Sequence, residues 1–264
     1  MVTARFRFYG ELNDFLPRER RGRAFATSCA RAATVKHMIE ALGVPHTEVE
    51  LILANGETSD FDRLLEEGDR VAVYPKFETF DITPLLRVRE RPPRRPRFVA
   101  DAHLGGLARL LRMAGFDTLY DNHYHDDQIA AIAVDEDRVV LTRDRELLKR
   151  RTVTHGCYLH ALRPAQQFHE LFERLDLAAS ARPFTICLHC NLPLRAVDKA
   201  AVLHRLPPSV RALHDEFNTC DRCARVFWKG SHHKRMTELL DSVTGAARQR
   251  APGVESAANP DPGP

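Results

Sequence analysis

Between residues 98 and 175, short apolar runs alternate with stretches in which apolar residues recur at helical spacing. A short apolar run is typical of a buried strand, and the helical spacing indicates an amphipathic helix. The predicted strands are 98–100, 116–120, 139–142 and 157–162, and the predicted helices are 104–111, 128–134, 145–150 and 165–175. This alternation predicts right-handed crossovers and a parallel sheet with helices on its faces. We therefore expect an α/β domain whose site lies at the carboxyl ends of the strands.

Acidic residues follow the first three predicted strands or open the second helix. They are Asp101, Asp121, Asp126, Asp127 and Asp144. Carboxylates gathered at one edge repel one another unless a hard cation lies between them, which favours Mg²⁺ or Mn²⁺. Each aspartate alone also suits a helix N-cap. Their recurrence favours Asp101 and Asp144 as metal ligands, then Asp126 or Asp127, and Asp121 least.

These segments resemble the Mut7-C RNase domain, a branch of the PIN-like nucleases. The resemblance is carried by residues 98–101, 104–112, 115–118, 126–127 and 141–148, and it continues through the cysteine-rich part to about residue 240. It implies a metal-dependent ribonuclease in which Asp101, Asp126 or Asp127, and Asp144 are the matching acidic positions. The glutamate that PIN-like enzymes commonly add is not matched, which leaves a reduced or altered metal site open. Arg109, Arg112 and Arg143 are candidate phosphate contacts, and the alternative is that they are solvated.

The first 80 residues predict a small α+β unit. Residues 2–8 alternate like a half-buried strand, Thr34 is the predicted N-cap of a helix that ends at Gly43, and strands are expected at 49–53 and 70–74. The segments at 42–45, 52–56 and 68–71 resemble the ubiquitin-like β-grasp domains of sulfur carriers. Such carriers act through a carboxy-terminal Gly-Gly, whereas the only adjacent glycines here, Gly105 and Gly106, lie inside the next domain. We therefore expect a docking or scaffolding module rather than sulfur transfer.

Four of the six cysteines form two C-x-x-C pairs, Cys187 with Cys190 and Cys220 with Cys223. Four thiolates fit tetrahedral Zn²⁺, and a shell of four protein ligands is structural rather than catalytic. The alternative ligands are His189, His232 and His233, and the alternative chemistry is a redox C-x-x-C, for which one pair suffices. A helix is expected between the pairs, from Pro207 through Val210 and Leu213 to Phe217. Cys29 and Cys157 are expected in the core.

Aromatic and basic residues are interleaved just after the second cysteine pair, at 226–235. Such a pattern can stack bases and bind phosphates, so Lys229, Lys234 and Arg235 are candidate RNA contacts. Phe227 and Trp228 are expected to pack against the zinc ribbon instead.

The net charge of +3 is unevenly distributed. Residues 81–97 carry six arginines and two acidic residues, and 181–244 carry ten basic and six acidic residues, whereas 98–180 is acidic overall. Two basic segments that flank an acidic one suit an anionic polymer held around a metal site, although solvated faces give the same counts. The arginine- and proline-rich segment 81–97 predicts a stiff linker, and 245–264 predicts a disordered tail.

Together these features predict an α/β protein with an N-terminal β-grasp domain at 1–80, a PIN-like parallel domain at 98–180 and a zinc ribbon at 181–244. No apolar run is long enough to cross a bilayer and no secretory signal opens the chain, so we expect a cytoplasmic protein. The expected activity is metal-dependent cleavage of RNA, with structural Zn²⁺ and catalytic Mg²⁺ or Mn²⁺. The alternative is a non-catalytic RNA-binding adaptor with a degenerate metal site, whose β-grasp domain recruits a protein partner.

Overall fold

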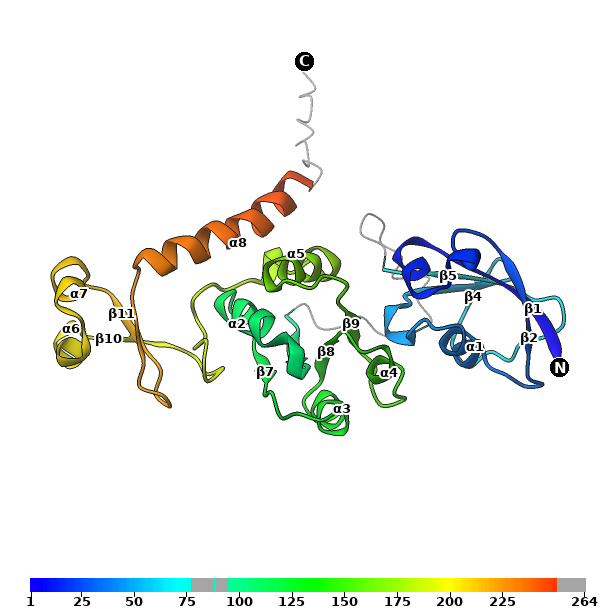
Figure 1. The fold of residues 1–264 in the computed structure, drawn as a ribbon, viewed down its shortest axis with the longest axis horizontal. Helices are drawn as coiled ribbons and strands as arrows, with labels where there is room; N and C mark the ends of the chain where they lie inside the picture. The colour runs from blue at the N-terminus through cyan, green and yellow to red at the C-terminus, as the bar shows by residue number, and fades with distance from the viewer. Residues whose placement is uncertain (77–87, 89–94, 251–264) are drawn as a thin grey trace, which may run out of the picture.

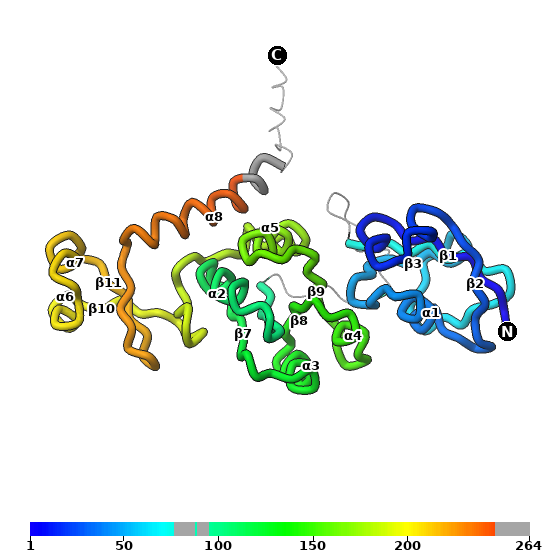
Figure 2. Tube along the Cα trace, in the orientation of Figure 1, coloured from blue at the N-terminus to red at the C-terminus, as the bar shows by residue number. Residues whose placement is uncertain are grey.

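The computed structural model describes residues 1–76, 88 and 95–250. Most of the predicted linker at 81–97 and most of the predicted tail at 245–264 therefore lie outside the described residues. Three parts follow one another along the long axis of the molecule (Figures 1 and 2): a five-stranded domain, a four-stranded parallel domain and a cysteine-rich part. In the part of the chain that is described, no helix has the length and apolar character needed to span a membrane.

The amino-terminal domain has the β-grasp topology. Its elements are β1 (Val2–Phe8), the 3-10 turns η1 (Gly10–Phe15) and η2 (Arg18–Arg20), β2 (Phe25–Cys29), α1 (Val35–Ala41), η3 (His46–Glu48), β3 (Leu51–Ala54), β4 (Glu57–Ser59) and β5 (Arg70–Tyr74). The sheet order is β2-β1-β5-β3-β4, with β1 and β5 parallel at the centre. Helix α1 packs on one face of this sheet (Figure 1), and its buried side chains join those of β1 and β5 in one core.

Three local predictions in this domain are confirmed: the N-cap of α1, the glycine that follows this helix and the Asn-Gly turn. The Thr34 hydroxyl accepts a hydrogen bond from the His37 amide at 3.2 Å and caps α1, and Gly43 has a positive φ of 104° after the helix. Asn55 and Gly56 form the turn between β3 and β4. Strands β2 and β4 were not predicted, because the β2 sequence Phe-Ala-Thr-Ser-Cys does not alternate apolar and polar residues and β4 has only three residues.

The central domain is a doubly wound parallel sheet, as predicted. Its elements are β6 (Arg97–Ala100), η5 (Ala102–Leu104), α2 (Gly105–Met113), β7 (Thr118–Tyr120), α3 (Asp126–Asp135), β8 (Arg138–Thr142), α4 (Arg145–Leu148), β9 (Gly156–Tyr158), α5 (Pro164–Leu175) and η6 (Ala178–Ser180). The sheet order is β7-β6-β8-β9, and each neighbouring pair is parallel. The order reverses between β6 and β8, which is the switch point where such sheets open a crevice at their carboxyl edge.

A hydrophobic core lies on each face of this sheet, because successive side chains of its buried strands point to opposite faces. Phe98 and Leu141 point to the face covered by α2 and α5, whereas Val99 and Val140 point to the face covered by α3 and α4. Cys157 lies in the first core and Cys29 in the core of the β-grasp domain, as expected.

Two predicted strands are shorter than expected. Phe116 lies in the turn that closes α2, where its amide donates to the Leu111 carbonyl at 2.9 Å, so β7 begins only at Thr118. The ladder of β9 ends near Leu159, whose amide donates to Thr142, and Leu162 is exposed. Arg97 belongs to β6 rather than to the linker.

The cysteine-rich part contains β10 (Arg195–Val197), α6 (Lys199–Val202), η7 (Leu203–Arg205), α7 (Pro208–Leu213), β11 (Phe217–Thr219), β12 (Val226–Phe227) and α8 (Ser231–Arg250). Strands β10, β11 and β12 form an antiparallel sheet. The predicted inserted helix is α7, but it ends at Leu213, and Phe217 is a buried strand residue.

Helix α8 returns from the cysteine-rich part to the central domain. Leu240 and Val243 are buried in the same core as α2 and α5, and Ser242 Oγ lies 3.0 Å from His169 Nε2 on α5. The helix continues through Arg250, so the predicted disordered tail does not begin at residue 245. Contacts of Leu240, Ser242 and Val243 with the central domain hold the middle of α8 in place.

The β-grasp domain covers the β9 edge of the central sheet. Glu48 Oε1 accepts the Tyr158 amide at 2.6 Å, and Glu48 forms an ion pair with Arg174, which donates to the Tyr158 carbonyl at 2.6 Å. The Glu48 side chain is only 1% exposed. His46 Nε2 lies 2.9 Å from the Val153 carbonyl oxygen. The amide and the carbonyl of Tyr158 are therefore both hydrogen-bonded to side chains, so neither is available to pair with another strand.

Candidate functional site

Asp101 and Asp144 follow neighbouring strands of the central sheet at its switch point. Asp101 comes directly after β6, and Asp144 follows β8 by two residues. The hydroxyl of Thr142, the last residue of β8, donates to Asp101 Oδ2 at 2.6 Å and accepts the Asp144 amide at 2.9 Å. Thr142 is fully buried. One buried hydroxyl therefore fixes both acidic positions relative to each other.

Both aspartates are also helix caps. Asp101 Oδ1 accepts the Ala102 amide at 2.6 Å at the start of η5, and Asp144 Oδ1 accepts the Glu146 amide at 2.8 Å at the start of α4. Capping and ligand binding are compatible, since each carboxylate has two oxygens with two lone pairs. Among the described residues, none donates a hydrogen bond to Asp144 Oδ2, so this oxygen is available.

Asp126 and Asp127 open α3 and face Arg150 rather than the other two aspartates. Arg150 Nη1 donates to Asp127 Oδ1, and Arg150 Nη2 lies 3.7 Å from Asp126 Oδ2. The hydrogen bond to Asp127, together with the charges of Asp126 and Asp144, raises the pKa of Arg150. A guanidinium thus lies against the two carboxylates at the start of α3.

The structure therefore assembles the predicted acidic set only in part. Among the described residues, the four C-x-x-C cysteines form the only group of three or more ligand residues whose ligand atoms lie within 4.8 Å of one another. Asp121 serves a turn, because its Oδ1 accepts the His123 amide at 2.9 Å and its side chain is exposed.

The three arginines predicted to contact phosphate differ in accessibility. Arg109 and Arg143 are exposed. Arg112 is 6% exposed, and its guanidinium donates to the carbonyls of Thr118, Leu188 and His189. Its assignment to RNA binding is therefore corrected: Arg112 ties α2 to the first cysteine pair. Burial lowers its pKa, which nearby Cys187 and Asp117 partly offset.

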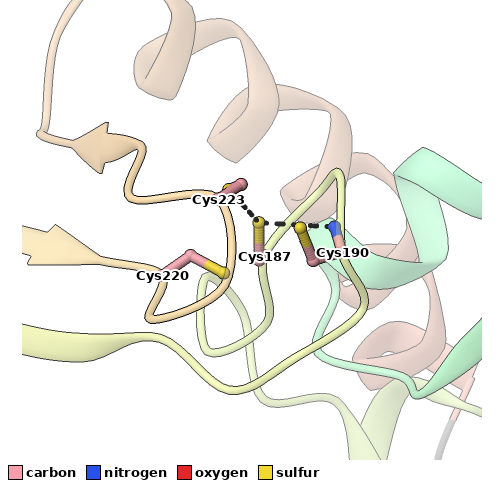
Figure 3. Close-up of side chains that lie close together, drawn as sticks. All are labelled: Cys187, Cys190, Cys220 and Cys223. Atoms are coloured by element: carbon pink, nitrogen blue, oxygen red, sulfur yellow. Dashed lines mark hydrogen bonds between the residues drawn. The ribbon is translucent and has the colours of Figure 1, made fainter.

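The four cysteine sulfurs point toward one another from two separate loops (Figure 3). Two thiolates bound to tetrahedral zinc at about 2.3 Å lie about 3.8 Å apart. The sulfurs of Cys187 and Cys223 are 3.7 Å apart, which fits this geometry. The donor set therefore suits zinc and leaves no open position for a substrate. His189, His232 and His233 are outside the group, as predicted, and His233 stacks on Phe184 with ring centroids 4.1 Å apart.

The two cysteine loops have the same backbone design. The amide four residues after the first cysteine donates back to the carbonyl of that cysteine: Asn191 to Cys187 at 3.0 Å and Ala224 to Cys220 at 2.8 Å. Asn191 and Ala224 both have a positive φ near 55–58°. This repeated turn directs each pair of sulfurs inward. It also lowers the pKa of Cys223 to about 7 through a hydrogen bond from the Arg225 backbone, with burial acting in the opposite direction.

The first cysteine loop covers the β7 edge of the central sheet. Asn191 Oδ1 accepts the Thr118 amide at 2.8 Å, and Asn191 Nδ2 donates to Asp117. Asp117 is also paired with Arg138 through two hydrogen bonds of 2.8 and 2.9 Å. Burial opposes ionisation of Asp117, but the hydrogen bonds from Arg138 and Asn191 outweigh it and lower its pKa. The first cysteine loop and the sheet are thus one connected structure.

In the aromatic and basic stretch after the second cysteine pair, the predicted packing against the ribbon is confirmed for Trp228. Trp228 packs against the small core that contains Phe217, and Phe227 is not part of that core. Lys229, Lys234 and Arg235 are exposed. Lys229 forms an ion pair with Glu216 at 2.6 Å, and Lys234 and Arg235 lie in the first turns of α8.

Sequence reasoning missed Thr142, Arg150 and Asn191. A hydroxyl at the end of an apolar strand was a usable signal for Thr142, since a buried polar group needs a partner. Arg150 and Asn191 gave none, because their partners are 23 and 73–74 residues away.

Two family models match this chain between residues 1 and 240. The profile of the Mut7-C RNAse domain matches residues 96–240, and that of the Mut7-C ubiquitin domain matches residues 1–81. Two crystal structures of small archaeal modifier protein 1 from Haloferax volcanii, 19% and 18% identical, cover 29% and 30% of this chain and 100% and 99% of their own chains. Their TM-scores are 0.25 and 0.24. The search of curated proteins gave no match. The chain belongs to the Mut7-C RNase domain family and carries that family's ubiquitin-like domain at its amino terminus.

Proposed function

We propose that this protein is a divalent-metal-dependent ribonuclease that hydrolyses RNA phosphodiester bonds. The observation that carries the proposal is the pair Asp101 and Asp144 at the ends of neighbouring parallel strands, joined through the Thr142 hydroxyl. Ligand sites of doubly wound sheets lie in this crevice. Membership in the Mut7-C RNase domain family supports RNA as the polymer.

The donor set fits Mg²⁺ or Mn²⁺. Both ions prefer carboxylate oxygens, and Mg²⁺ commonly binds one or two carboxylates and completes its shell with water and substrate phosphate. Asp101 and Asp144 would hold it, and Asp126 or Asp127 would join them in the proposed site. When bound, such a cation lowers the pKa of water and neutralises charge on the phosphate.

The chain's own residues would position the metal-binding carboxylates and the RNA. Thr142 holds the Asp101 carboxylate by a hydrogen bond, and the capping bond from Glu146 fixes Asp144. Arg109 and Arg143 are exposed cations of the central domain that would bind RNA phosphates, and Lys229, Lys234 and Arg235 would extend the grip to the zinc ribbon. The proposed zinc has a structural role, and the β-grasp domain would recruit a protein partner in the cytoplasm.

One observation favours the second candidate, a non-catalytic RNA-binding adaptor. Arg150 already neutralises Asp126 and Asp127, so the third acidic position of the site has a cation within the chain. If Arg150 keeps this place in solution, the metal site has only Asp101 and Asp144. The two candidates differ in turnover rather than in RNA affinity.

Cleavage of labelled RNA by the zinc-loaded protein distinguishes them. Divalent cations other than zinc are removed by desalting rather than by a strong chelator, and Mg²⁺ or Mn²⁺ is then added back. Asp101→Asn and Asp144→Asn are compared with Asp121→Asn, the same substitution at the same sheet edge but in a turn whose hydrogen bond asparagine can keep.

The ribonuclease proposal expects metal-dependent cleavage by the wild type and by Asp121→Asn, and a loss of at least about 100-fold for the other two, with RNA affinity retained. Cleavage that Asp144→Asn leaves intact contradicts the assigned ligands. Tight RNA binding with no cleavage by the wild type supports the adaptor.

A further inference from the structure

The outward face of the β-grasp sheet carries a concentration of positive charge. Along β1, Phe6 and Phe8 are buried against α1, so Arg5 and Arg7 point to the opposite face and are exposed. Along β5, Val71 and Val73 are buried, and Arg70 is exposed on the same outward face as Arg5. In the described strands, the outward-facing positions include these three arginines and no carboxylate.

Two of these arginines are direct neighbours across the central strand pair. Arg5 and Arg70 are register partners of the parallel strands β1 and β5. Like charges placed directly opposite each other on one face of a sheet are destabilising. Among the described residues, neither Arg5 nor Arg70 forms an ion pair. The fold therefore bears a repulsive pair that an anionic ligand would relieve.

Aromatic rings continue this face. Tyr9 follows β1, and its amide bonds to the Val73 carbonyl at 3.0 Å, so it extends the strand register and lies opposite Tyr74. The two rings stack with centroids 4.3 Å apart and an interplanar angle of 10°. The Arg7 guanidinium lies 4.8 Å from the Tyr9 ring centroid. Cations beside aromatic rings on an exposed sheet are the combination with which proteins bind single-stranded nucleic acid.

We propose that the outward face of the β-grasp sheet, centred on Arg5, Arg7, Arg70, Tyr9 and Tyr74, is a second binding surface for single-stranded RNA. Charge complementarity selects the ligand, because the arginines need an anion and the rings offer stacking that is tolerant of base identity. The inference rests on RNA as the proposed substrate. It adds a function to the domain: the β-grasp module holds a distant part of the strand that the central domain cleaves.

Among the described residues, no hydrogen bond, ion pair or ring contact joins Arg5, Arg7 or Arg70 to the central domain. The described contacts between the two domains come from η1 and η3, through Phe15, His46 and Glu48. These turns adjoin the Tyr9–Tyr74 end of the sheet, whereas Arg5 and Arg70 pair toward its other end, and helix α1 covers the inward side. An RNA strand can therefore reach the arginines while the two domains stay docked.

RNA affinity of the full-length, zinc-loaded protein tests the proposal. Fluorescence anisotropy with a long labelled single strand compares the wild type with Arg5→Ala/Arg70→Ala and with Arg31→Ala/Lys36→Ala. The second variant removes the same number of cations from the turn before α1 and from α1 itself, away from the outward face. Thermal denaturation accompanies both, because relief of the Arg5–Arg70 repulsion should leave the folded state at least as stable as the wild type.

The expected result for Arg5→Ala/Arg70→Ala is about a tenfold loss of affinity at low salt and a decrease of about 1.4 in the slope of log K against log salt, at about 0.7 per phosphate contact. The Arg31→Ala/Lys36→Ala variant keeps the wild-type slope. RNA that contains 4-thiouridine should crosslink to peptides of β1 and β5. Equal slopes for all three proteins, or crosslinks confined to residues beyond 97, overturn the proposal and leave the face to an acidic protein partner.

Failure of this inference is distinguishable from failure of the proposed ribonuclease. A short oligonucleotide that cannot span both domains, at saturating concentration, should be cleaved equally by the wild type and the Arg5→Ala/Arg70→Ala variant. If the wild type cleaves no RNA at all, the ribonuclease proposal fails, whereas the binding comparison still decides whether this face binds RNA.

Discussion

Replacing Glu48 by alanine should release the β-grasp domain from the central sheet. The Glu48 carboxylate is 1% exposed and binds both the Tyr158 amide and the Arg174 guanidinium. Alanine leaves an edge amide without its acceptor and a largely buried arginine without its main partner. Truncating one member of a buried ion pair costs about 3–5 kcal/mol, because the remaining charge is stranded.

The structure places the expected cost at the lower end of that range. Arg174 is 20% exposed, and Glu170 lies 3.9 Å from it as a remaining partner. A cost of about 3 kcal/mol corresponds to a change of about 150-fold in the docking equilibrium, at tenfold for every 1.4 kcal/mol.

Hydrogen–deuterium exchange of the peptide that contains Tyr158 measures this change directly. We expect its protection to fall by about 100-fold in Glu48→Ala, while amides of β6 and β8 at the sheet centre keep theirs. The variant Glu48→Leu/Arg174→Met removes both charges together, so it should lose less protection than Glu48→Ala. Unchanged exchange of Tyr158 in Glu48→Ala would refute the reasoning, as would a double variant that loses more protection than the single one.

Three further predictions concern the metal centre, the β7 edge and a close backbone approach. Cys220→Ser should bind less than one zinc per chain and unfold at lower temperature, as measured by atomic emission and calorimetry; full zinc retention argues against a four-cysteine site. Because the pKa of Asp117 is lowered in the folded state, its contribution is present at neutral pH and is lost as the pH falls below the unfolded value, about 3.9, through the lowered one. The difference in urea midpoint between the wild type and Asp117→Asn should therefore shrink in acid, and a constant difference contradicts this. Gly115→Ala would bring a Cβ to 1.9 Å from the Arg182 carbonyl at a φ of 87°, whereas Gly68→Ala, at a φ of 84°, meets nothing within 4 Å. Gly68→Ala should cost about 1 kcal/mol and Gly115→Ala clearly more in thermal denaturation, and equal costs refute the steric argument.

The periodicity of the sequence was sufficient to predict the central sheet. Strands such as β8 are buried on both faces and therefore appear as continuous apolar runs, and their helices have clear apolar stripes. The two cysteine pairs were equally informative, because their spacing is set by tetrahedral coordination. Both kinds of signal depend on residues close in sequence.

Features that depend on residues far apart in sequence could not be predicted. Arg112 has the pattern of a helix-surface cation, yet the chain brings the Leu188 and His189 carbonyls over it, 76 and 77 residues away. Glu48 likewise lies in a short polar turn, and its burial arises only when a strand more than a hundred residues away packs against it. The residues next to a charged side chain in the sequence give no information about such distant partners. A buried charged residue therefore cannot be distinguished from a solvated one by sequence alone.

The return of α8 to the central core makes the zinc ribbon an insertion within the nuclease fold rather than an appendage after it. Leu240 and Val243 complete the core that Phe98 begins. On the ribosome, the ribbon has therefore emerged in full before the core that surrounds α2 and α5 can close. All four cysteines are therefore available while the core of α2 and α5 still lacks its last helix, and a chain that stops after the second cysteine pair would present the cysteine-rich part beside an open, apolar core.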